Sequence, residues 1–246
     1  MLLVIPILIF SCTGAEQIAR DETAENPEKK QDTLKLEEQE QKKFEYLFVE
    51  ALKEKALGNP QKAIQLFSSC LEIDPNSSAS MYELASIHAS NNDFTSASLL
   101  LEKAISLNPD NKWYKLLLAQ VYQQNRQFSK SAAIYNQLLQ KEPENKEYLY
   151  RKAVLLSNAG KIEEAIETYD KLEEKAGINE QISVAKQQLY VEKGEIEKAF
   201  REIEKLIEYN PEDPKYYGLM ADLYQSQGDT VNAMKYYRKI KEVDPE

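Results

Sequence analysis

From Phe44 to the end of the chain, apolar residues recur with the spacing of amphipathic helices. The pattern returns at a 34-residue interval, which is clearest in a column of small residues: Ala63, Ala97, Ser131, Ala165, Ala199 and Ala233. A second column holds large apolar residues: Phe67, Leu101, Tyr135, Tyr169, Ile203 and Tyr237. This self-similarity predicts six repeat units, residues 44–77, 78–111, 112–145, 146–179, 180–213 and 214–246.

Each unit is predicted to hold two antiparallel helices of about 13 residues, because a break interrupts the apolar pattern in its middle. The breaks are Gly58-Asn59-Pro60, Asn91-Asn92, Asn125-Arg126, Gly160, Gly194 and Gly228. Proline follows the second helix at positions 75, 109, 143, 211 and 245. We expect it to stop that helix and to set the first turn of the next. The small column would let neighbouring helices approach closely, so the fold class is all-α.

These small, aromatic and proline columns resemble the tetratricopeptide repeat, and the resemblance extends over residues 44–246. It implies a right-handed helical-repeat solenoid of six tetratricopeptide-like helix pairs. The fifth unit departs most from the pattern. Gly177 replaces the proline there, and Gln187 stands in a further small-residue column that otherwise holds Ala51, Ala85, Ala119, Ala153 and Ala221. We expect Gly177 to serve as a helix C-cap and the local geometry to differ there.

In this family the first helices of successive pairs line a concave face that holds ligand segments. The resemblance implies a partner-binding groove that contains Phe48, Tyr82, Trp113, Leu116, Gln120, Tyr150, Arg151 and Val154. Aromatic side chains beside amides suit a partner segment with apolar anchors and a hydrogen-bonding backbone. Trp113 is either a binding hot spot or a residue packed on the preceding helix around Leu107. At the inner positions of the central units only Arg151 is cationic, which disfavours the subtype that clamps chaperone C-termini.

The chain begins with MLLVIPILIFSCTGAEQ, whose apolar run is too short to span a bilayer but suits the core of a secretion signal. The phrase Ile9-Phe10-Ser11-Cys12 resembles the cleavage box of bacterial lipoproteins. The resemblance implies a signal peptide over residues 1–11 and lipid attachment to Cys12, which would anchor the protein to a membrane. An ordinary cleaved signal, or an apolar stub with a buried thiol, are the alternatives.

Residues 12–43 are rich in charge and contain no aromatic residue, so they are predicted to form an acidic tether that behaves as coil. From Leu34 the segment is compatible with helix. At the other end, the last unit finishes at the proline that would introduce a seventh unit, without a closing helix. We therefore expect either that the sequence continues in the full gene or that the uncapped C-terminal repeat self-associates.

Charge and residue types exclude several classes of function. A net charge of −10 without a large basic cluster argues against nucleic acid as a partner. Two distant cysteines and one histidine support neither a disulfide framework nor a metal site, and no cofactor is expected. His88 and Cys70 fall in columns of packed residues, so they are predicted to be core side chains. Glu163-Glu164 and Glu173-Glu174 are interpreted as solvated helix faces, not as a carboxylate pair for acid–base catalysis.

The sequence therefore predicts a non-enzymatic scaffold that binds a protein or peptide segment in its concave groove. It would be lipid-anchored through Cys12 to a membrane of a Gram-negative cell envelope, facing the periplasm. The alternative is a periplasmic or secreted chaperone-like subunit of an assembly or secretion machine, without a lipid anchor.

Overall fold

The structure, a computed structural model of the 246-residue chain, describes residues 27–244, and within them it is all-helical, with twelve helices and no strand. The helices are α1 (Pro27–Ala56), α2 (Pro60–Ile73), α3 (Ser78–Ser90), α4 (Phe94–Leu107), α5 (Lys112–Gln124), α6 (Phe128–Lys141), α7 (Lys146–Asn158), α8 (Ile162–Ala176), α9 (Glu180–Lys193), α10 (Ile196–Tyr209), α11 (Pro214–Ser226) and α12 (Thr230–Val243). The fold class predicted from the sequence is confirmed.

The chain divides into two units, residues 1–45 and residues 46–246. In the first unit the chain is helical from Pro27, so the predicted tether is helix, not coil, over its described part. Residues 35–43 are exposed, and an ion pair of 2.6 Å between Glu38 and Lys42 links successive turns. Such pairs favour a helix that buries little apolar surface. The predicted signal peptide and Cys12 lie outside the described residues.

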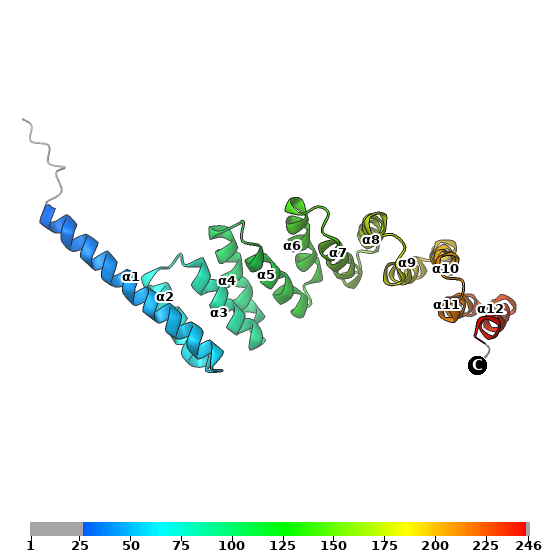
Figure 1. The fold of residues 1–246 in the computed structure, drawn as a ribbon, viewed down its shortest axis with the longest axis horizontal. Coiled ribbons are helices and arrows are strands. Elements are labelled where there is room, and N and C mark those ends of the chain that lie inside the picture. The colour runs from blue at the N-terminus through cyan, green and yellow to red at the C-terminus, as the bar shows by residue number, and fades with distance from the viewer. Residues whose placement is uncertain (1–26, 245–246) are drawn as a thin grey trace, which may run out of the picture. The chain divides into compact units, whose positions relative to one another are not determined.

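In the second unit each helix packs against the helices before and after it in the chain, as Figure 1 shows for α2 to α12. The small-residue column lies where the two helices of a pair approach, and its members are all buried. Ser131 replaces alanine there without leaving its hydroxyl unpaired, because Oγ donates to the carbonyl oxygen of Ala119 at 2.7 Å. A larger side chain at this column would push the paired helices apart.

The turns inside the pairs repeat one backbone conformation. Positive φ angles occur at Gly58, Asn92, Arg126, Gly160, Gly194 and Gly228, which are spaced by 34 residues. Glycine adopts this left-handed conformation without steric cost, whereas Asn92 and Arg126 adopt it as non-glycine residues, with φ of 61° and 56°. The breaks read from the sequence are therefore real turns, and each reverses the chain between a first and a second helix.

The connections between pairs differ from the prediction in one respect. Pro75 follows the C-cap of α2, but α3 begins only at Ser78. The proline thus lies in the connecting turn and does not set the first turn of the next helix. That turn is stabilised by polar N-caps whose side chains accept backbone N–H groups: Ser77, Asn111, Asn145, Asn179 and Asp213. Gly177 is the C-cap of α8, as expected.

The apolar core is continuous from α3 to α9 and resumes in a separate cluster over α10 and α11. Between the two lies Lys186 of α9, whose side chain is only 2% exposed. Lys186 occupies the repeat position at which Leu84, Leu118 and Met220 are buried in other units. A cation therefore stands where the repeat pattern places an apolar side chain.

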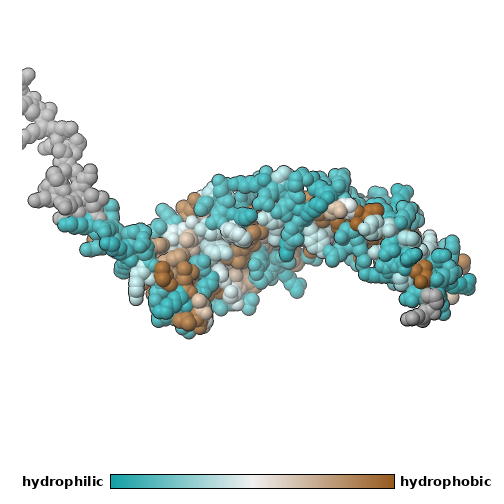
Figure 2. All heavy atoms as spheres, in the orientation of Figure 1, coloured by the Kyte–Doolittle hydropathy of each residue, from teal (hydrophilic) through white to brown (hydrophobic). Residues whose placement is uncertain are grey.

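The surface is mostly polar. In the view of Figure 2 hydrophilic residues cover most of the visible face, and hydrophobic residues gather in separate patches. None of the helices in residues 27–244 has the length and apolar character needed to cross a membrane.

Candidate functional site

Two adjoining pockets lie between α5 and α7, the first helices of two successive pairs. Their volumes are about 370 and 100 Å³, and both are lined by Gln123 and Arg151. We call their joint lining the α5–α7 groove: Leu116, Gln120, Gln123, Tyr135, Glu147, Tyr148, Tyr150, Arg151, Val154 and Leu155.

Helical spacing brings these side chains to one face. Leu116, Gln120 and Gln123 are four and three residues apart on α5, so they lie above one another on the same side of that helix. Glu147, Arg151 and Val154 have the same spacing on α7. Tyr135 of α6 is buried between these helices, and its ring centroid lies 5.9 Å from that of Tyr148. The groove thus has an aromatic floor and walls of mixed polarity.

The groove carries one cation, and that cation is already paired. Arg151 donates from Nε to Oε1 of Glu147 at 2.6 Å, and both side chains are more than half exposed. Such an exposed pair contributes little to stability, so the guanidinium can exchange partners at low cost. Gln120 and Gln123 are exposed and offer both donors and acceptors. Burial raises the pKa of Tyr135, so its hydroxyl stays neutral. These groups suit a peptide backbone with apolar side chains.

The structure brings five of the eight residues predicted for the groove together around these pockets: Leu116, Gln120, Tyr150, Arg151 and Val154. Two others are partly buried elsewhere. The ring centroid of Phe48 is 5.5 Å from that of Phe67, and the ring of Tyr82 lies 5.2 Å from that of Tyr114. Neither lines these two pockets, and their role in binding stays a prediction.

Trp113 points to solvent. Its side chain is 61% exposed, and the ammonium of Lys112 lies 5.7 Å from its ring centroid. Leu107, around which the alternative packs this side chain, is itself 42% exposed, so little of the indole surface is covered. An exposed indole leaves a hot-spot role open, and that role stays a prediction.

Sequence reasoning missed the two tyrosines under the groove. Tyr135 belongs to the column of large apolar residues and is buried like most of its members, but it also lines the cleft. The sequence signal for this second role is the hydroxyl of Tyr135, which Phe67 and Leu101 lack at the same position in the first two units. Tyr148 is buried against it and completes the floor.

His88 and Cys70 are packed against other residues and are not placed for catalysis. His88 is partly buried and its Nδ1 lies 3.0 Å from Oδ2 of Asp93, which confirms a hydrogen-bonded histidine. Cys70 is fully buried, and burial raises the pKa of its thiol, which disfavours a thiolate. Over residues 27–244, no group of three or more His, Cys, Asp or Glu side chains is placed to hold a metal ion.

The interpretation of Glu173 as part of a solvated face is wrong. Its side chain is only 17% exposed, and Oε2 lies 2.8 Å from Nζ of the buried Lys186. Lys186 also contacts Asp170 at 2.6 Å and Glu202 at 3.0 Å. Burial alone would lower the pKa of Lys186, but hydrogen bonds to these three carboxylates raise it. The lysine is therefore a charged bridge between α8, α9 and α10.

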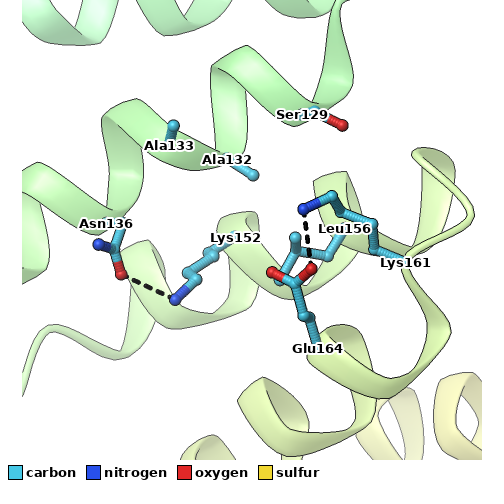
Figure 3. Close-up of a pocket in the computed structure, with 8 residues that line it drawn as sticks. All are labelled: Ser129, Ala132, Ala133, Asn136, Lys152, Leu156, Lys161 and Glu164. Carbon is cyan, nitrogen blue, oxygen red and sulfur yellow. Dashed lines mark hydrogen bonds and ion pairs between the residues drawn. The ribbon is translucent and has the colours of Figure 1, made fainter.

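A further pocket of about 250 Å³ lies among α6, α7 and α8 and shares no lining residue with the groove. We call it the α6–α8 pocket, and Figure 3 shows its lining: Ser129, Ala132, Ala133, Asn136, Lys152, Leu156, Lys161 and Glu164. Lys152 donates to Oδ1 of Asn136 at 2.9 Å. Lys161 donates to Oε1 of Glu164 at 2.8 Å.

Comparisons with known proteins agree with the helix pairs. A profile described as Tetratricopeptide repeat matches residues 55–121, 89–148, 123–189 and 159–223, and a second profile of that description matches residues 214–246. A search of curated protein sequences gives no match.

Several solved structures have a similar fold. A tetratricopeptide repeat protein from Parabacteroides merdae ATCC 43184 is 22% identical over 81% of this chain and 79% of its own, with a TM-score of 0.57. A chain of Naa15/Naa10 bound to HypK-THB is 20% identical over 86% of this chain and 33% of its own, with a TM-score of 0.71. YrrB, described as a TPR protein with an unusual peptide-binding site, is 14% identical over 73% of this chain and 93% of its own, with a TM-score of 0.50.

At these identities the likeness to solved structures concerns the fold, which is consistent with a protein–protein interaction scaffold. The family profiles together cover residues 55–246, well over half of the chain. The chain therefore belongs to the tetratricopeptide repeat family.

Proposed function

We propose that this protein is a non-enzymatic scaffold that binds an extended segment of a partner protein in the α5–α7 groove. The observation that carries the proposal is the convergence of five predicted groove residues from two successive first helices on adjoining pockets. Leu116, Tyr150 and Val154 would receive apolar side chains of the segment. The exposed amides of Gln120 and Gln123 would pair with its backbone.

The description of YrrB as a protein with a peptide-binding site supports this assignment, because it has a related fold. The polarity of the groove supports it as well. Its single guanidinium is held by Glu147, so a partner needs no cluster of acidic residues to bind here. Apolar anchors and backbone hydrogen bonds would carry the affinity.

Selection of peptides from a displayed library on the full-length protein tests the groove. We expect the selected peptides to bind the parent and a Tyr209→Ala variant equally, because Tyr209 is 66% exposed and lies outside the groove. Replacement of Tyr150 or Val154 by alanine should weaken binding at least about tenfold, as expected for central anchors. Circular dichroism must show that all variants are folded. Equal binding by the groove variants would move the site to another face.

We propose further that Cys12 carries a lipid that holds the protein on a bacterial envelope membrane, facing the periplasm. The support is the sequence Ile9-Phe10-Ser11-Cys12 after an apolar run. Expression of the Cys12→Ala variant, followed by membrane fractionation, tests it. Release into the soluble fraction supports the anchor, and unchanged partitioning favours the unanchored chaperone-like subunit.

Self-association through the last repeat also belongs to this proposal. Met234 of α12 is 48% exposed, and Tyr237 and Ile240 are only partly buried, whereas their counterparts Ile203 and Leu206 are buried. Such a face suits contact with a second copy. Analytical ultracentrifugation of the parent and of Met234→Lys tests it, and an unchanged sedimentation coefficient across concentrations would contradict it.

A further inference from the structure

Lys152 and Lys186 are 34 residues apart and occupy the same position in successive repeats. Their surroundings can therefore be compared position by position. The three carboxylates around Lys186 have uncharged residues as counterparts one repeat earlier: Asp170 corresponds to Asn136, Glu173 to Leu139 and Glu202 to Thr168. At these three positions the lysine thus has acidic residues in one repeat junction and uncharged residues in the other.

Lys186 has a full set of partners. Its ammonium contacts Asp170 at 2.6 Å, Glu173 at 2.8 Å and Glu202 at 3.0 Å. A protonated lysine has three N–H donors, so these contacts can satisfy all of them. Burial of an ammonium group is costly unless such partners compensate for lost water. Helix α8 of the fourth repeat supplies two of them, and α10 of the fifth repeat supplies the third.

Lys152 is half-buried and lacks that compensation. Among the described residues its hydrogen-bond partner is the amide oxygen of Asn136 at 2.9 Å, and no carboxylate lies within ion-pair distance. The one carboxylate that lines the α6–α8 pocket, Glu164, is held by Lys161 at 2.8 Å. Figure 3 shows these two pairs on opposite sides of the pocket. Two donors of the Lys152 ammonium remain for a ligand.

Local electrostatics point the same way. Burial lowers the pKa of Lys152, and the charge of nearby Lys171 lowers it further, against the weaker opposite effect of Glu164 and Glu167. An anion placed beside Lys152 would offset the cost of burying its charge and its repulsion from Lys171. The carboxylates around Lys186 show which kind of anion the repeat geometry accommodates at this position.

We infer that the α6–α8 pocket receives the carboxylate of a Glu or Asp side chain from a partner protein, which takes at Lys152 the place that carboxylates take at Lys186. The pocket measures about 250 Å³, below the roughly 300 to 1,000 Å³ of sites for whole small molecules, so a single side chain fits it best. The net charge of −10 repels densely acidic segments. The partner segment should therefore carry one isolated acidic residue among uncharged ones.

Nuclear magnetic resonance on the full chain with isotope-labelled lysine side chains tests this inference. The probes are the peptide acetyl-Ala-Glu-Ala-amide, its Gln analogue and sodium acetate. We expect the Glu peptide to shift the Lys152 side-chain signals in a saturable manner, with a Kd at least about tenfold below that of acetate. The Gln analogue should leave the signals unchanged. Lack of a saturable shift, or an equal response to the Gln analogue, would overturn the proposal.

Acetate that binds as tightly as the Glu peptide would also overturn it, because the pocket would then take free carboxylates without regard to a protein segment. The Glu peptide should also shift the side-chain signals of Lys161, which lines the same pocket, and Lys152→Met should abolish that shift. Met220 at the same repeat position indicates that methionine is accommodated. Asn136→Asp places a carboxylate where Asp170 stands in the next repeat, and it should weaken peptide binding at least about tenfold. Lys112→Met, on the 50% exposed side chain of α5, is the matched control and should leave binding unchanged.

Discussion

Repeats four and five place a lysine at the same position and use it in opposite ways. In repeat five Lys186 joins α8, α9 and α10 through three carboxylates, whereas in repeat four Lys152 borders an open pocket with one amide partner. The position in the repeat therefore determines where the lysine side chain lies, and the residues of the neighbouring helices determine whether its ammonium is paired with carboxylates. The difference lies in the residues 16 and 13 positions before the lysine and 16 positions after it, which are acidic around Lys186 and uncharged around Lys152.

The bridge lies at a junction where few residues of α8 and α9 approach each other. Helices α8 and α9 approach each other over fewer residues than α6 and α7 do. Ser183 is buried on α9 at the position of Leu149 and Tyr217, so less apolar surface is available there. Within residues 27–244, the hydroxyl of Ser183 and Oε1 of Glu173 have no hydrogen-bond partner. The junction thus depends on charges, which hold it only while all members stay ionised.

Removal of the Lys186 charge should have the largest effect. Lys186→Met leaves Glu173 and the buried Glu202 with Lys205 as their remaining cation, and we expect a loss of about 2 to 3 kcal/mol in stability. The matched variant Lys152→Met should change stability by less than about 1 kcal/mol. Thermal unfolding followed by circular dichroism, with hydrogen exchange of α8 to α10, measures both. Equal melting of the two variants would show that the two lysines are equivalent.

At low pH, the contacts around Lys186 should weaken before those around Lys152. Burial would raise the pKa of Glu173, but hydrogen bonds and charges from Lys186 and Lys205 lower it below the ordinary value of 4.5. A carboxyl group with a lower pKa in the folded state stabilises the fold above its unfolded pKa, and this contribution disappears as the pH falls through the folded pKa. We therefore expect the melting temperature to fall below about pH 4.5.

The matched pair Glu173→Gln and Glu174→Gln separates this effect from general acid denaturation. Glu173→Gln should flatten the acidic part of the melting profile, because the titrating group is gone. Glu174 is exposed, so Glu174→Gln should keep the parent profile. Identical acid profiles for both variants would assign the acid sensitivity to other carboxylates.

A carboxylate introduced beside Lys152 should slightly stabilise the packing of α6 against α7. Asn136→Asp forms an ion pair with the half-buried Lys152, for which we expect about 0.5 to 1 kcal/mol. The gain should shrink at high salt, because the new aspartate is partly exposed to screening ions. Urea unfolding at low and high salt measures it. A loss of stability would mean that Lys152 cannot accept a carboxylate, and the comparison with Lys186 would fail.

The smallest expected effect concerns the turns. Arg126 adopts a φ of 56° where Gly160 and Gly194 occupy the equivalent positions. Arg126→Gly should raise stability by about 0.5 kcal/mol, because relief of the strained backbone exceeds the entropy cost of glycine. Asn125, with a φ of −81°, is the control, and Asn125→Gly should not stabilise. Urea unfolding of both variants tests this, and stabilisation by both would refute the explanation through positive φ.

Much of the fold could be predicted because helix and turn signals are local. The apolar spacing defines each helix within a few turns, and Gly58, Gly160, Gly194 and Gly228 mark turns that need a positive φ. The capping role of Gly177 followed from the same local chemistry. The groove was predicted in part, since Leu116, Gln120, Tyr150, Arg151 and Val154 lie on faces that helical spacing defines.

The sequence by itself determined the repeat period, the helix pairs, the turns and the family, because these depend on residues within one repeat. The tertiary structure alone decided that Lys186 and Glu173 are buried together, that Trp113 is exposed and that Tyr135 lines the groove. These outcomes depend on how three successive helices cross, and helical spacing carries no information about that crossing. For the same reason two lysines in one repeat position read alike in the sequence and differ in the folded chain.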